Sequence, residues 1–260
     1  MHSVQRCSGC KLEFVQPFLV SEDLPNSAPT AEAYLAALST HHSILRELSR
    51  FRAAKRLGLY TELLGGRQPR RVLEVGCGSG WMVWALTELG IEAQGIEIDT
   101  GLVQIAKNLG AQVTQADICN VGRRQFEGFD VVCSSQVVEH LFKPRQAMLA
   151  MASALREGGV IHVDVPNADS WGARVRRIYH QDKNWGAISL PHHQVGYHPQ
   201  SLACLFRMSG LQSERLLERP TDDALYGQII LPKAWLSRVA MTLTHGLGHG
   251  YLLVGVARKV

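Results

Sequence analysis

The sequence predicts an α/β fold in which helices cover both faces of a mostly parallel β-sheet. Short apolar runs rich in β-branched residues alternate with stretches whose apolar residues recur at helical spacing. Parallel neighbours need a crossover connection, which is usually a helix, so this alternation favours a parallel sheet. With 260 residues, 46% of them hydrophobic, the chain is long enough for one large α/β core.

The elements are expected in the following order. Residues from about 31 to 64 are predicted to form a helix, with one apolar stripe made of Ile44, Leu45, Leu48 and Phe51. Five strands are expected at 72–75, 92–98, 112–116, 129–134 and 160–165. Between these strands, two groups of apolar residues recur at helical spacing and predict helices. They are Leu102, Ile105, Ala106 and Leu109, and then Ala147, Met148, Met151, Ala152 and Leu155. A helix at about 200–209, a strand near 211–217 and an apolar run at 251–257 complete the chain.

The first strand runs directly into a glycine-rich turn, Gly76, Gly78 and Gly80. Glycine has no Cβ, so such a turn lets backbone N–H groups approach a ligand closely. A dinucleotide-binding turn has a third glycine where this chain has Trp81, and the turn also lacks the Gly-Lys-Ser/Thr ending of a phosphate-binding loop. Glu74 would repel a pyrophosphate but suits an ammonium or sulfonium group. These features favour S-adenosylmethionine, which carries both cations.

Two further acidic residues stand where the next two strands end. Glu97 lies about twenty residues past the glycines, the usual distance to a carboxylate that accepts ribose hydroxyls. Asp117 ends the third apolar stretch, where its carboxylate is expected to take an adenine amino group.

Three segments resemble the cofactor motifs of class I S-adenosylmethionine-dependent methyltransferases. They are VLEVGCGSG at 72–80, GIEID at 95–99 and QADI at 115–118. Two later segments, FDVVCSSQVVEHL at 129–141 and LREGGVIHVDVPN at 155–167, resemble small-molecule methyltransferases related to the ubiquinone-biosynthesis O-methyltransferases. The resemblance extends from about Arg70 to the C-terminus, with a variable insertion after Pro220.

The resemblance implies a Rossmann-like, seven-stranded, mostly parallel sheet with helices on both faces and an antiparallel last strand. It implies a core at 70–260 with insertions at about 167–198 and 221–250, preceded by a helical cap at 31–69 and an N-terminal extension at 1–30. The implied cofactor-binding residues are Glu74, Gly76, Cys77, Gly78, Gly80, Glu97, Ile98, Asp117, Ile118 and Ser134. The helical cap is expected either to pack against the sheet or to cover the substrate opening, and the sequence does not decide between these two roles.

Cys7 and Cys10 in the N-terminal extension have the spacing of a zinc knuckle, and their segment resembles half of a zinc ribbon that precedes some such methyltransferases. A structural zinc ion takes four ligands, and the chain has no second Cys-x-x-Cys pair. The favoured interpretation is therefore that this segment is the remnant of a zinc ribbon and binds no zinc. The alternative is a zinc site that His2, His41 or His42 completes. The other cysteines are expected to be reduced thiols.

Methyl transfer from a sulfonium is an in-line displacement that depends mainly on positioning. An oxygen nucleophile must also lose a proton, and histidine suits that task at neutral pH. His140 follows the fourth strand, and the resemblance places the loop carrying His192 and His193 over the substrate, so these three are the candidate bases; packing or capping is the alternative for His140. Metal binding by this histidine-rich loop is not expected, because carboxylates are sparse around it.

Several functions are disfavoured. The net charge of +4 is too mild to indicate nucleic-acid binding, and Ser134–Val137 replace the Asn/Asp-Pro-Pro-aromatic motif of nucleobase methyltransferases. No apolar stretch is long enough to span a membrane, and no signal-peptide pattern begins the chain, so a cytoplasmic location is expected. The apolar stretch 225–251 is expected to be packed cover, with contact to a membrane surface as the alternative.

The sequence therefore predicts a methyltransferase that acts on a small molecule, with oxygen as the favoured acceptor atom. A quinone precursor, a lipid-linked acceptor and a glycan all remain open as the acceptor. Arg174, Arg176 and Arg177, interleaved with aromatic residues, form either a solvated basic face or a grip on an anionic acceptor. The competing hypothesis is a non-catalytic S-adenosylmethionine-binding interaction protein.

Overall fold

A computed structural model describes residues 3–17, 31–121, 125–179, 184–190, 193–219 and 250–260. The helix α1 (Ala31–Leu63) is described as backbone from its start, and its side chains from His42 onward. Most of the insertion expected at 221–250, the apolar stretch discussed for membrane contact, and His192 lie outside these ranges.

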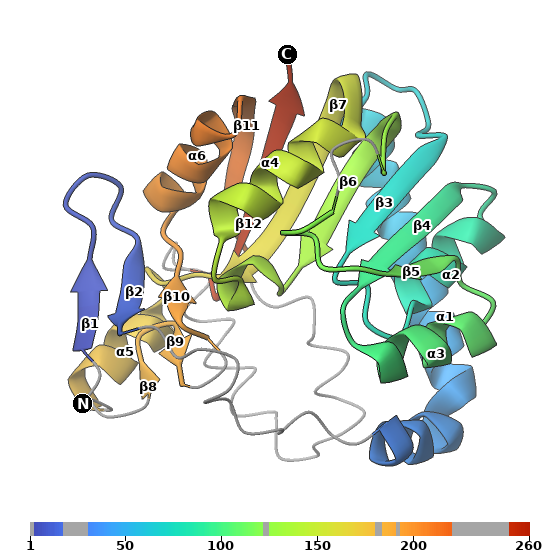
Figure 1. The fold of residues 1–260 in the computed structure, drawn as a ribbon, viewed down its shortest axis with the longest axis horizontal. Coiled ribbons are helices and arrows are strands. Elements are labelled where there is room, and N and C mark those ends of the chain that lie inside the picture. The colour runs from blue at the N-terminus through green and yellow to red at the C-terminus, as the bar shows by residue number, and fades with distance from the viewer. Residues whose placement is uncertain (1–2, 18–30, 122–124, 180–183, 191–192, 220–249) are drawn as a thin grey trace.

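One seven-stranded sheet forms the centre of the molecule (Figure 1). Its strands, in spatial order, are β11 (Leu211–Arg219), β12 (Leu252–Lys259), β7 (Leu155–Pro166), β6 (Phe129–Ser135), β3 (Arg71–Val75), β4 (Glu92–Glu97) and β5 (Val113–Gln115). Strands β7, β6, β3, β4 and β5 pair in parallel. Each strand predicted from the sequence is present, and the predicted fold class is confirmed.

The last strand of the chain, β12, enters the sheet between β7 and β11 and is antiparallel to both. This confirms the antiparallel last strand that the resemblance implied. β7 begins at Leu155, five residues earlier than predicted, because Leu155 already pairs with Phe129 before an irregularity that precedes the Val131–Val160 pair. The preceding helix α4 (Pro144–Ala154) ends there.

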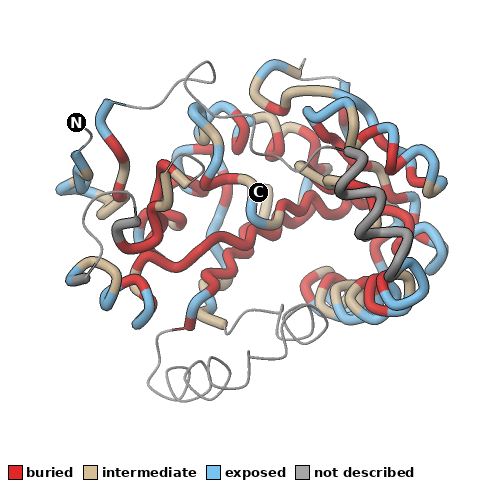
Figure 2. Tube along the Cα trace, turned by 90° about the horizontal axis from the view of Figure 1, so that it is seen from below, coloured by how far each residue is buried: buried red, intermediate tan, exposed pale blue. Residues whose placement is uncertain are grey.

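Helices cover both faces of this sheet. On one face, α1, α2 (Trp81–Glu88) and α3 (Thr100–Asn108) bury side chains such as Tyr60, Leu86 and Val103. On the other face, α4 and α6 (Pro199–Met208) bury Met148, Met151 and Phe206, among others. The central strands are buried almost throughout, as Figure 2 shows, since both faces are covered.

A smaller sheet, which the sequence did not predict, lies beside the β11 side of the molecule (Figure 1). It consists of the hairpin strands β1 (Ser3–Arg6) and β2 (Glu13–Gln16) and of β10 (Val195–Gly196) from the loop before α6. Cys7 and Cys10 lie at the turn of this hairpin, where backbone N–H groups of Cys10 and Gly9 lower the pKa of the Cys7 thiol. Of the histidines considered as their partners, His42 packs against Trp81 of α2.

The hairpin is attached to the main domain through the buried carboxylate of Glu13. One oxygen of Glu13 lies 2.7 Å from Arg177 Nη2 and 3.1 Å from His198 Nε2. Arg177 belongs to α5 (Trp171–Tyr179), and His198 stands at the N-terminus of α6. Arg177 also donates to the carbonyl of Ala168, so this arginine of the predicted basic segment has a structural contact.

The remaining short elements are β8 (Asn184–Trp185), β9 (Ile188–Ser189) and the single turn η2 (Val138–His140). β8 and β9 form a two-stranded ribbon. No helix in the described part of the chain has the length and apolar character needed to cross a membrane.

Candidate active site

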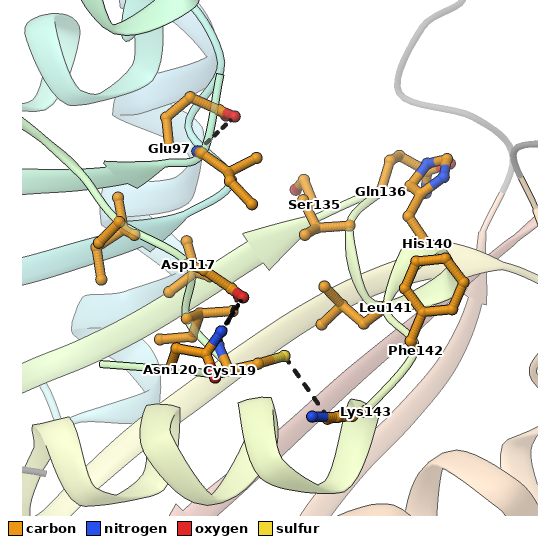
Figure 3. A pocket seen from close by; sticks show the side chains of 17 residues that line it. Glu97, Asp117, Cys119, Asn120, Ser135, Gln136, His140, Leu141, Phe142 and Lys143 are labelled. Atoms are coloured by element: carbon orange, nitrogen blue, oxygen red, sulfur yellow. Dashed lines mark hydrogen bonds between the residues drawn. The ribbon is translucent and has the colours of Figure 1, made fainter. Parts of the chain in front are cut away.

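A cavity of about 530 Å³ lies at the C-terminal ends of β3, β4, β5 and β6. This edge is where open α/β sheets bind ligands. The lining comes from these four strand ends and from the loop that follows β6. Figure 3 shows Glu97 and Asp117 on one side of the cavity and His140 on the other. Of the predicted site residues, Gly76, Glu97, Ile98, Asp117, Ile118 and His140 line the cavity.

The glycine turn begins at Gly76, whose N–H donates to the carbonyl of Ile96 on the neighbouring strand at 2.8 Å. Gly76 has a φ of 70°, a conformation that L side chains rarely adopt. Gly80 ends the turn and caps α2, and a Cβ there would lie 2.8 Å from the Cβ of Ala106 on α3. Glycine at Gly80 therefore allows close helix packing, and Trp81 opens α2.

Glu97 is held in place by backbone donors. Its Oε1 accepts from the N–H groups of Ile98 at 2.8 Å and Asp99 at 3.0 Å, and its Oε2 accepts from the N–H of Gly78 at 2.9 Å. Each carboxylate oxygen has two acceptor positions, so Oε1 is filled and one position on Oε2 remains for a ligand hydroxyl. The glycine turn and the carboxylate thus orient each other at the cavity wall.

Asp117 adopts a similar local arrangement after β5. Its Oδ1 accepts from the N–H of Cys119 at 2.9 Å and its Oδ2 accepts from Asn120 Nδ2 at 2.7 Å. Ile98 and Ile118 add apolar surface to the same wall, and the Ile98 side chain is 65% exposed. An exposed isoleucine next to two carboxylates suits a ligand that has a flat apolar ring and polar edges.

The other predicted cofactor residues stand behind this lining. Gly78 contributes its N–H to Glu97, while the Cys77 thiol packs where a Cβ on Gly95 would lie, 2.5 Å away. Burial, reinforced by Glu74 and Glu97, raises the pKa of Cys77. Ser134 is buried in β6, and its hydroxyl has no hydrogen-bond partner among the described residues.

Glu74 is buried and lies 3.8 Å from the guanidinium of Arg56, a residue of α1. Burial raises the pKa of Glu74 to about 7, although Arg56 acts in the opposite direction. The contact of Glu74 with a cofactor cation stays a prediction, since its neighbour in this structure is the arginine.

Arg56 belongs to a buried polar network that sequence reasoning missed. Its Nη2 donates to Ser135 Oγ and, at 3.2 Å, to Asp164 Oδ2, while Ser135 Oγ donates to the same Asp164 oxygen at 2.7 Å. His162 Nε2 lies 3.0 Å from the other Asp164 oxygen, and His162 Nδ1 is 3.1 Å from the Tyr60 hydroxyl. Because Ser135 lines the cavity, this network holds one part of its wall. Its members come from three distant elements, so no local motif reveals them.

His140 lines the other end of the cavity, and the fold brings Glu139 and His193 next to it, with one donor atom of each of the three lying within 4.8 Å of the others. The His140 and His193 rings are 4.6 Å apart between centroids, at an angle of 72°. His193 comes from the loop before β10, so two of the three predicted catalytic histidines meet here; His192 lies outside the described residues.

Glu139 is 1% exposed, and neither of its carboxylate oxygens has a hydrogen-bond partner among the described residues. Its Oε1 lies 4.0 Å from His140 Nε2. Burial raises the pKa of Glu139 to about 8. The hydroxyl of the buried Tyr197 also lacks a hydrogen-bond partner in the described part of the chain. Burial raises the pKa of Tyr197, and the charge of Glu139 adds to this effect. Glu139 was not predicted as a site residue, although its place directly before His140 was visible in the sequence.

Comparison with known proteins agrees with this geometry. A family model described as a methyltransferase domain matches residues 44–216. A ubiquinone biosynthesis O-methyltransferase of Bordetella avium is 28% identical over 118 residues, which are 43% of this chain and 49% of the relative. The chain thus spans about half the length of the curated relatives it matches.

Two solved structures share the fold. An S-adenosylmethionine-dependent methyltransferase from Archaeoglobus fulgidus has a TM-score of 0.56 and 21% identity, covering 82% of this chain and 94% of the other. A methyltransferase from Thermotoga maritima, described as a possible histamine N-methyltransferase, has a TM-score of 0.56 and 19% identity, covering 89% and 96%. The matched family model includes the glycine turn, Glu97, Asp117 and His140. The chain therefore belongs to the methyltransferase-domain family and has the fold of class I methyltransferases, whose cofactor is S-adenosylmethionine.

Proposed function

We propose that this protein transfers a methyl group from S-adenosylmethionine to an oxygen atom of a small-molecule acceptor. The observation that carries the proposal is the cavity itself, which has two anchored carboxylates at one end and His140 at the other, where His140 is grouped with His193 and the buried carboxylate of Glu139. The first end suits a nucleoside and the second suits the handling of an acceptor proton.

The residues present fit the cofactor. Glu97 Oε2 has an acceptor position left for a ribose hydroxyl, and each oxygen of Asp117 has one left for an adenine amino group. Ile98 and Ile118 supply the apolar surface that an adenine ring needs. A cavity of about 530 Å³ is within the usual range for a ligand of this size. When bound, S-adenosylmethionine supplies a methyl carbon that an acceptor oxygen attacks in line, while the carbon–sulfur bond breaks and its electron pair stays on sulfur.

The protein's contribution to that reaction is positioning and proton handling. Ser135, held by Arg56 and Asp164, and Gln136, which has a φ of 56°, form the wall between the two ends. His140 lines the cavity beyond them and can take the proton of an acceptor hydroxyl on a ring nitrogen. His193, packed against the His140 ring, orients it or shares this task. An amine acceptor that is already neutral would need no such group.

Curated relatives support oxygen as the acceptor atom, because relatives that match part of the chain are named ubiquinone biosynthesis O-methyltransferases. The acceptor class that follows is a phenolic quinone precursor. The arginines of α5 offer less support for an anionic acceptor, since Arg176 donates to the carbonyl of Gly186 and Arg177 to that of Ala168.

Calorimetric titration of the purified chain with S-adenosylmethionine, S-adenosylhomocysteine and NAD tests the cofactor. Micromolar binding of the two sulfur nucleosides and no binding of NAD is the expected result. Incubation with methyl-labelled cofactor and a panel of phenols matched to anilines then tests the acceptor atom. Label transfer to phenols supports the proposal, transfer only to anilines overturns the oxygen assignment, and cofactor binding with no transfer to either favours a non-catalytic binding protein.

A further inference from the structure

We infer that Glu139, His140 and His193 form a binding site for a divalent first-row transition-metal ion at the acceptor end of the cavity. The role given to the ion rests on the proposed function, whereas its binding can be measured separately. The sequence argued against a metal because carboxylates are sparse around the histidine-rich loop; folding places the carboxylate of Glu139 beside His193.

The first argument is the state of Glu139. Its side chain is 1% exposed, and both oxygens lack a hydrogen-bond partner among the described residues. Burying a carboxyl group without partners is costly, so such groups are usually paired or coordinate a metal. By contrast, Glu13, which is equally buried, contacts Arg177 and His198. Glu139 is therefore a buried acceptor that has no hydrogen-bond partner in the described part of the chain.

The second argument is the geometry of the three donors. An ion bound to imidazole and carboxylate lies about 2.0 to 2.2 Å from each donor atom, so two donors of one ion are at most about 4.3 Å apart. Glu139 Oε1 and His140 Nε2 are 4.0 Å apart, within this limit. All three donors lie within 4.8 Å of one another, and side-chain shifts of less than about 1 Å bring the widest pair into range.

The donor set selects the class of ion. Two imidazole nitrogens and one carboxylate are suitable ligands for zinc, manganese, iron or cobalt. Calcium and magnesium prefer sites made of oxygen ligands alone. Three protein ligands also leave at least one coordination position open. Because His140 lines the cavity, an acceptor hydroxyl can occupy that position. The ion would then lower the pKa of the hydroxyl, and the proton would leave to solvent water. The deprotonated oxygen would form the new bond to the methyl carbon of S-adenosylmethionine, while the carbon–sulfur bond breaks and its electron pair stays on sulfur.

This assignment differs from proton removal by a histidine base. If His140 and His193 are ligands, their ring nitrogens are occupied by the ion, and the acceptor loses its proton without an imidazole. Glu139 then acts as a ligand, a role that the base hypothesis does not give it.

The test is titration of chelator-treated full-length protein with Co²⁺, followed by its visible absorption bands and by calorimetry, with Zn²⁺ as competitor. We expect one ion per chain, bands typical of mixed nitrogen and oxygen coordination, and displacement by Zn²⁺. Glu139→Gln and His193→Asn should each weaken Co²⁺ binding at least about tenfold. His42→Asn is the matched control, because His42 packs against Trp81 outside this group, and should leave the affinity unchanged.

Circular dichroism reports whether each variant is folded, and titration with S-adenosylhomocysteine separates the two hypotheses. Since His193 is only partly buried, His193→Asn serves if Glu139→Gln does not fold. No Co²⁺ binding, or equal binding by the wild type and a folded His193→Asn variant, overturns the metal site even if the nucleoside binds. Co²⁺ binding that depends on these residues, without nucleoside binding, supports the site and overturns the proposed function instead.

Discussion

Val137 lies directly against Gly76: a Cβ added to Gly76 would come within 2.3 Å of Val137 Cγ2. Gly76 opens the cofactor turn after β3, and Val137 belongs to the loop after β6, so the two residues join neighbouring strand ends across the cavity wall. The absence of a side chain at Gly76 therefore serves both the left-handed backbone and the contact with the next loop.

Gly76→Ala should destabilise the protein by about 2 to 5 kcal/mol, the sum of a left-handed backbone and an overpacked contact. Chemical denaturation measures this change. Val137→Ala in the same chain should recover part of the loss, because it removes the atom that clashes. Gly90→Ala is the control: Gly90 has a φ of 82° but no atom within 4 Å of its added Cβ, so only the backbone cost should appear.

Glu97→Ala should weaken binding of S-adenosylhomocysteine by about 1 to 3 kcal/mol through the loss of charged hydrogen bonds. Calorimetry checks the prediction. Glu92→Ala on the same strand removes an exposed ion pair with Arg71 and should leave binding unchanged. Equal affinity of wild type and Glu97→Ala would contradict the assignment of Glu97 to the ribose.

Asp164 should support stability at neutral pH and lose that effect in acid. Burial alone would raise its pKa, but His162, Arg56 and Ser135 lower it below the usual value near 3.8. The folded carboxylate thus binds protons less readily than the unfolded one, so its contribution is present above about pH 4 and falls as the pH drops further. Asp164→Asn should cost about 3 to 5 kcal/mol at pH 7, because it removes the buried charge that faces Arg56 and His162.

Urea unfolding of both proteins from pH 7 down to pH 3 measures this difference. The gap between wild type and Asp164→Asn should narrow toward the acid end. A gap that widens below pH 4 would show that the lowered pKa of Asp164 is wrong.

Glu13→Gln should lower stability by about 3 to 5 kcal/mol, since it removes the charge that faces Arg177 and His198 in a buried site. Cofactor affinity should change little, because Glu13 lies outside the cavity lining. Thermal unfolding checks the expected loss of stability, and nucleoside titration checks the unchanged cofactor affinity. Glu157→Gln, at an exposed carboxylate beside Lys259, serves as the neutral comparison.

The predictable part of the site is the part that local sequence encodes. Gly76, Glu97 and Asp117 each end a strand, and strand ends of a parallel sheet converge on one edge, so their meeting follows from the element order alone. The short strands β1, β2 and β10 escaped prediction because each is only two to four residues long. Arg56, Asp164 and Glu139 escaped because their roles depend on contacts between distant elements that no spacing reveals.

The pairing of β2 with β10 gives the first residues of the chain an influence at the acceptor end. His193 is held on one side by backbone bonds to Ser189, and the next residue, Gln194, accepts from the N–H of Val15 on the other. A tag, a truncation or a bound partner at the N-terminal hairpin would therefore act on the placement of an imidazole nearly two hundred positions later. Changes to the N-terminal hairpin are therefore a way to alter the position of His193, and with it the group that His193 forms with His140 and Glu139.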